Sequence, residues 1–133
     1  MTLYQWPIAL GLQRGFGESI AVRRRTAARP HKGLDIHADV GTAVLSACSG
    51  RVVRIQRGTG RTLSQKKAGP FVDIAELSNG KETGLIFRYL HLGPDLLVKA
   101  GEIVKAGQIL GTVGDRASSG IKNSKPHLHF EIR

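Results

Sequence analysis

The chain has 133 residues, of which 41% are hydrophobic, and it contains 17 glycines and a single cysteine. This length supports one hydrophobic core and is too short for two, so we expect a single domain over residues 1–133. One cysteine excludes an internal disulfide framework, and no apolar stretch is long enough to form a transmembrane helix. Twenty Lys and Arg residues against ten Asp and Glu residues give a net charge of +10, which favours a polyanionic partner or surface.

The positive charge does not by itself indicate nucleic-acid binding. Apart from Arg23, Arg24 and Arg25 the basic residues are scattered, and aromatic residues make up only 5% of the chain. No predicted strand alternates basic and aromatic residues, as a surface for stacking bases does. We therefore expect no nucleic-acid partner. A nucleic-acid-binding β-domain ranks below the two functions that the motifs of this chain favour, which are described at the end of this subsection.

Residues 1–30 read as a leading segment that ends in a basic loop from Arg23 to Pro30. The start has no basic region before an apolar run, and Pro7 interrupts its only short apolar stretch, so no signal peptide is visible. Pro30 disfavours helix for the residue before it, and the chain therefore enters His31 in an extended conformation.

The first strand is predicted at 31–36, where polar and apolar residues alternate. On a strand His31 and Asp35 share one face, which makes them a pair of possible metal ligands. His37 lies two residues after Asp35, so it would project from the same face of the strand and is a competing candidate for a metal ligand. Asp39, just before a glycine turn, is a weaker one.

Short runs of Val and Ile between glycine turns favour an all-β fold with closely spaced strands. Cys48 has small neighbours and reads as a packed residue rather than a metal or redox partner. His91 ends a strand that looks buried, where the strand opens into a loop. Further strands are predicted at 41–47, 50–55, 71–77 and 84–91.

Two segments between or after these strands have their own character. Residues 57–70 are rich in Gly, Lys and Arg and nearly lack apolar residues, so we expect a long exposed loop. Residues 98–103 and 104–109 are two copies of one six-residue pattern. The repeat predicts two similar strand-and-turn units with Val and Ile inward.

The last strand, predicted over 126–132, carries two histidines on one face. Because side chains alternate along a strand, His127 and His129 project to the same side, about 6.6 Å apart. Three apolar residues fill the other face. An isolated His-x-His is as often a structural pair as a site, so the remaining histidines decide its meaning.

The four histidines and one aspartate singled out above together offer three metal ligands and two further bases. This set suits a catalytic zinc site with one open position. Structural zinc sites are usually closed by four protein ligands and often use cysteine, which is nearly absent here. Mixed imidazole and carboxylate ligands favour zinc over magnesium or calcium. The five residues are His31, Asp35, His91, His127 and His129.

At this point the chain resembles a known family, the LytM or lysostaphin-type zinc endopeptidases that cut peptide bonds in peptidoglycan. The joint match covers roughly residues 6–133 and is far more specific than a lone His-x-His. It rests on His31-x-Gly33-x-Asp35, Gly41-Thr42-Ala43-Val44 leading to Gly50-x-Val52, Tyr89-x-His91-Leu92, Val104-x-x-Gly107-Gln108, and His127-Leu128-His129-Phe130-Glu131.

The resemblance implies an antiparallel β-sheet with an active-site groove walled by loops, little helix, and a catalytic core over 31–133. It implies that His31, Asp35 and His129 hold Zn²⁺ and that His91 and His127 are the catalytic histidines. His37 and Asp39 fall at positions that the family motif leaves open, which demotes both.

The implied chemistry is metal-assisted hydrolysis, in which zinc lowers the pKa of a bound water to about 7 and polarises the scissile carbonyl. The sequence has no helical His-Glu-x-x-His, so a neutral imidazole must act as base. His127 is our first choice, with His91 orienting the water or stabilising the oxyanion, and the two roles are interchangeable. Glu131 shares their face as a carboxylate behind the ligands or at the surface.

We therefore expect a monomeric zinc endopeptidase that hydrolyses stem peptides or cross-bridges of peptidoglycan, an anionic partner that suits the basic surface. The alternative is an inactive peptidoglycan-binding or amidase-activating relative, although no ligand is lost here. The site of action would be the bacterial cell wall, periplasmic or extracellular. The sequence leaves the export route open, and phage-type or alternative secretion and a leader already removed all fit it. Two departures from the family pattern, at 57–70 and at 123–126, bear on substrate choice.

Overall fold

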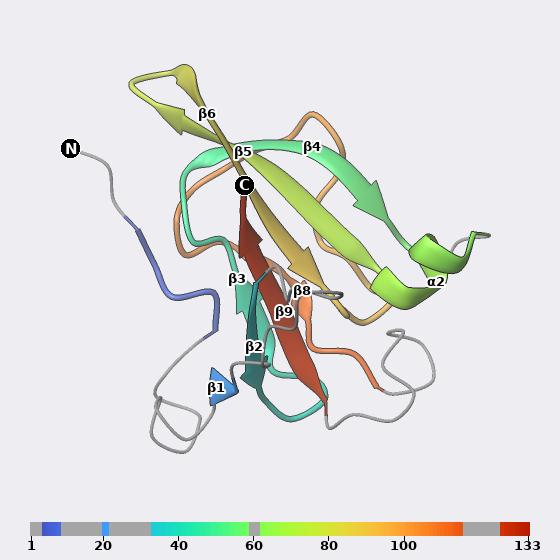
Figure 1. Ribbon diagram of the computed structural model, residues 1–133. Coiled ribbons are helices and arrows are strands. Elements are labelled where there is room, and N and C mark those ends of the chain that lie inside the picture. The colour runs from blue at the N-terminus through green and yellow to red at the C-terminus, as the bar shows by residue number, and fades with distance from the viewer. Residues whose placement is uncertain (1–3, 9–19, 22–32, 59–61, 116–125) are drawn as a thin grey trace, which may run out of the picture.

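The computed structural model describes residues 4–8, 20–21, 33–58, 62–115 and 126–133. A seven-stranded antiparallel sheet has the strand order β1-β2-β9-β6-β5-β4-β7, and a smaller antiparallel sheet pairs β3 with β8 (Figure 1). The expected all-β fold with little helix is confirmed. The elements are β1 Ile20–Ala21, β2 Leu34–His37, β3 Ala43–Leu45, β4 Gly50–Gln56, α2 Leu63–Ala68, β5 Phe71–Ser78, β6 Lys81–Leu90, β7 Ile103–Val104, β8 Ile109–Thr112 and β9 His127–Ile132.

The register of the large sheet gathers its polar residues on one face. β9 lies between β2 and β6, so Asp35 stands opposite His129 on one side and Glu131 stands opposite Arg88 on the other. Arg88 in turn lies opposite Asp73 of β5. Because side chains alternate along each strand, these residues share one face of the sheet, across four neighbouring strands.

The opposite face of the same strands forms the hydrophobic core. Leu128 of β9, Tyr89 of β6 and Val72 of β5 are fully buried and belong to one cluster with Val44 of β3 and Leu110 of β8. The smaller sheet therefore packs against the apolar face of the larger one. Burial of one large aliphatic or aromatic side chain stabilises a fold by about 1.5–3 kcal/mol, so this cluster fixes the sheet that carries the polar face.

Residues 57–70 are only partly the exposed loop that we expected, because they contain helix α2. The Thr62 hydroxyl accepts from the Gln65 backbone N–H, and the Gln65 side chain accepts from the Thr62 backbone N–H, which is a capping box. Gly69 ends the helix at a φ of 64°. The Gln56 amide donates to the carbonyls of Gln65 and Gly69 and ties the helix to β4. Within the described residues, no helix is both long and apolar enough to cross a membrane.

The six-residue repeat forms two similar turns, but its isoleucines point outward. The turn glycines, Gly101 and Gly107, both have a φ of 90°. Val98 and Val104 are buried as expected, whereas Ile103 and Ile109 are exposed, which corrects half of the prediction. The two copies enter different sheets, since β7 pairs with β4 and β8 with β3. Each isoleucine alternates with a buried neighbour on a sheet edge and so faces away from the core.

Cys48 is a buried free thiol, and we expect it to be unreactive in the folded protein. Burial, and next the negative charge of Glu76, raise its pKa to about 12. Because the thiolate is the reactive species, alkylation should stay slow throughout the neutral and mildly alkaline range. Iodoacetamide labelling followed by mass spectrometry would check this, with the denatured protein as the labelled control. Rapid labelling of the native protein would contradict it.

Candidate metal centre

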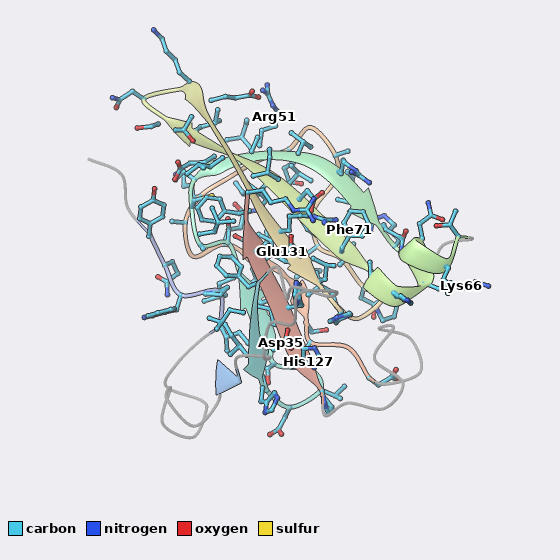
Figure 2. The ribbon with its side chains drawn as sticks, viewed as in Figure 1. Asp35, Arg51, Lys66, Phe71, His127 and Glu131 are labelled. Atoms are coloured by element: carbon cyan, nitrogen blue, oxygen red, sulfur yellow. The ribbon has the colours of Figure 1, made fainter. Side chains whose placement is uncertain are left out.

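Asp35 and His129 face each other across the pair of strands β2 and β9. Oδ1 of Asp35 lies 2.8 Å from Nδ1 of His129 and 3.8 Å from Nε2 of His127. All three side chains are buried. Figure 2 shows Asp35 and His127 close together at one end of this strand pair, with Glu131 further along β9. The register of the sheet thus brings together three of the five residues predicted from the sequence.

His91 joins this group from the end of β6. The centroid of its ring lies 5.0 Å from that of His127 and 6.0 Å from that of His129. Its backbone is left-handed, with a φ of 66°, which is uncommon for a residue other than glycine. The His91 N–H donates to the carbonyl of Ala68, the last residue of α2, and the His91 carbonyl accepts from Gly114. Helix α2 and the chain after β8 therefore hold His91 in place.

The other predicted candidates have different outcomes. His31 lies outside the described residues, as does the departure at 123–125. His37 is partly buried, with its ring centroid 6.2 Å from that of His127, so it borders the group. Asp39 is exposed.

Glu131 contacts His129 directly, and so lies closer to the candidate metal site than the sequence indicated. It is buried, and its Oε1 lies 2.8 Å from Nε2 of His129. Its Oε2 accepts a hydrogen bond of 2.8 Å from Nε of Arg133 and lies 3.9 Å from Nη1 of Arg88. Arg88 also donates to Asp73 over 2.8 Å. The signal in the sequence was the shared parity of His129 and Glu131, which places their side chains on one face two residues apart.

The two carboxylates change the protonation of His129. Burial lowers the pKa of His129, but hydrogen bonds to Asp35 and Glu131 and the charges of both outweigh it, so this pKa lies above its ordinary value. For Glu131, burial raises the pKa, while the hydrogen bond and charge of His129 and the charge of Arg133 outweigh it, leaving the pKa lowered. Glu131 is therefore ionised at neutral pH.

The donor atoms present suit a zinc ion. A buried carboxylate oxygen and a buried imidazole nitrogen converge here, while the second nitrogen of the same ring is held by Glu131, as is typical of zinc-binding histidines. Among the residues that the structure covers, no group of three His, Cys, Asp or Glu side chains is placed to hold a metal by itself. The third ligand that the family resemblance implies, His31, falls outside them.

Antiparallel strands β2 and β9 thus place a carboxylate and two histidines on one face of a β-sheet domain, an arrangement compatible with part of a metal site. Comparison with known sequences gives the family: residues 29–133 match Peptidase family M23, and the chain belongs to it. The expected resemblance is thereby confirmed.

Three known proteins show how far the likeness extends. The chain is 36% identical over 104 residues to an uncharacterized metalloprotease of Haemophilus influenzae, covering 78% of this chain and 18% of that protein. It is 34% identical over 103 residues to the peptidoglycan DD-endopeptidase ShyB of Vibrio cholerae, covering 77% and 20%. The structure of a zinc-containing peptidase from Vibrio cholerae matches with a TM-score of 0.72 and 26% identity, over 99% of this chain and 36% of that one. The chain thus spans about a fifth of the length of these two curated relatives.

Proposed function

We propose that this chain is a zinc-dependent endopeptidase that hydrolyses peptide bonds in bacterial peptidoglycan. The observation that carries the proposal is the gathering of Asp35, His129, His127 and His91 on one face of the sheet. Membership of family M23 and the name of the relative ShyB support it. The proposal treats residues 1–133 as one domain acting at the cell wall.

His31, Asp35 and His129 would hold the zinc ion. Bound zinc supplies Lewis-acid polarisation of the scissile carbonyl and a water of lowered pKa. Asp35 Oδ1 lies between Nδ1 of His129 and Nε2 of His127, so a ligand and a base are side by side. This juxtaposition supports a proton transfer next to the metal site.

His127 and His91 would move the protons. Nε2 of His127 would accept the proton of the attacking water. This nitrogen lies 3.8 Å from Oδ1 of Asp35, a proposed metal ligand, so the base would stand next to the metal site. His91, with its ring 5.0 Å from that of His127, would orient the water or donate to the developing oxyanion. The left-handed backbone of His91 supports such a role, since strained residues cluster at functional sites.

Digestion of purified peptidoglycan sacculi tests this function. We expect the protein to release soluble peptide-linked fragments with new amino and carboxyl termini, identified by mass spectrometry. Removal of metal with a chelator should abolish the release, and added zinc should restore it, because metal activation of the water is lost and regained.

Digestion that continues unchanged after complete metal removal would refute zinc dependence. Sacculus binding without any new termini, in zinc-loaded protein, would instead support the inactive peptidoglycan-binding alternative.

A further inference from the structure

We propose that Glu131 is a positioning residue that acts through His129, directing the Nδ1 atom of that ring toward Asp35 and the metal. The inference rests on the proposed function, in which His129 is a ligand. It extends that function by assigning a role to a residue outside the proposed ligand set.

The geometry gives each nitrogen of His129 its own carboxylate. Nδ1 lies 2.8 Å from Asp35 on the neighbouring strand, and Nε2 lies 2.8 Å from Glu131 on the same strand. When zinc takes the place of the proton that Nδ1 shares with Asp35, the ring N–H on Nε2 donated to Glu131 would keep the lone pair of the ring on Nδ1 for the metal. Without an acceptor at Nε2, the ring would be free to take the other tautomer or to turn over.

Glu131 is itself held in one orientation. Arg133 bonds one of its oxygens, and Arg88 lies 3.9 Å from the same oxygen while bonding Asp73. These contacts leave Oε1 to the ring of His129. A run of alternating charges from Asp73 through Arg88 to Glu131 therefore reaches the histidine from three strands of the sheet.

The backbone at Gly33, just before β2, closes over this contact. A Cβ added at Gly33 would lie 2.7 Å from Cγ of Glu131 and 3.0 Å from Nε2 of His129. The space beside the pair is thus filled by main chain, and Glu131 and His129 are both buried. A buried hydrogen bond to a charged acceptor is stronger than one in water, so it is suited to fix a ring.

The test compares zinc affinity in Glu131→Ala and Glu131→Gln, measured by competition with a chromophoric chelator. Partners behind a metal ligand typically change metal affinity by about 10–100-fold, so we expect about 100-fold weaker binding for Glu131→Ala. Glu131→Gln keeps an acceptor for the ring N–H but loses the charge, and should weaken binding by about 10-fold. Nitrogen NMR of the zinc-loaded proteins should show zinc on Nδ1 of His129 in the wild type and a mixture of both nitrogens in Glu131→Ala.

Glu82→Gln is the matched control, because Glu82 is an exposed carboxylate that pairs with Arg51 on the same sheet. It should bind zinc as the wild type does. Wild-type affinity in both Glu131 variants, with zinc on Nδ1 throughout, would overturn the inference. If Glu131→Ala fails to fold, the isosteric Glu131→Gln decides it alone. A third outcome separates the two proposals. If the zinc affinities follow the expected order but the zinc-loaded wild type leaves sacculi intact, the inference about Glu131 stands and the proposed hydrolysis is refuted.

Discussion

Replacing His129 by alanine is expected to remove bound zinc and hydrolysis together, whereas His127→Ala should keep the zinc and lose the rate. His129 offers Nδ1 next to Asp35, so its loss leaves one fewer ligand and lowers metal affinity. His127 lies beside this pair and would serve as base. Loss of such a proton transfer typically costs about 10²–10⁴-fold in rate.

Elemental analysis of zinc content, measured beside the rate of peptidoglycan digestion, separates the two outcomes. His37→Ala is the matched control, because the His37 ring borders that of His127 but lies at a position that the family motif leaves open. It should retain both zinc and activity. Near wild-type hydrolysis by the His127 variant, with zinc unchanged, would remove His127 from the mechanism and leave His91 as the histidine base.

Gly33→Ala should damage both the fold and the metal site. The added Cβ would lie 2.5 Å from the carbonyl oxygen of Phe130, a main-chain atom of β9 that cannot turn aside. β2 would have to move away from β9, and with it Asp35 would leave His129. Overpacking of this kind costs about 1–3 kcal/mol, and zinc affinity should fall along with thermal stability.

Thermal unfolding and chelator competition measure the two effects of Gly33→Ala. A loss of this size corresponds to a fall in Tm of several degrees for a domain of this length, roughly 3–15 °C. Gly58→Ala is the control, since an added Cβ there meets nothing within 4 Å. Equal Tm and equal zinc affinity in the two variants would show that the close approach at Gly33 is not needed.

The sequence was sufficient to predict the fold class and to predict which side chains lie on the same face of a strand. Both follow from local patterns, because glycine turns delimit the strands and alternation places His127 and His129 together. The pairing of Asp35 with His129 joins residues 94 positions apart and is set by the order of strands in the sheet. Only the family motifs, which carry that order implicitly, put the two residues into one site.

Other features depended on tertiary contacts that no local pattern contains. The left-handed conformation of His91 follows from hydrogen bonds to Ala68 and Gly114, which come from distant parts of the chain. The outward turn of Ile103 follows from its place at the edge of the sheet. Helix α2 is a different case, because the capping pair Thr62 and Gln65 was visible in the sequence, inside a segment whose composition indicated a loop.

The hydrogen bond from His91 to Ala68 has a consequence for how the segment between β4 and β5 tolerates change. The acceptor is a main-chain carbonyl at the end of α2, so it is present whatever side chain occupies that position. Exposed residues of the helix, such as Lys66 and Lys67, are therefore open to exchange without altering the support of the histidine. An inserted or deleted residue would rotate the last turn by about 100° and carry the carbonyl away. For the support of His91, the exposed side chains of α2 can therefore be exchanged, while the length of the helix cannot change.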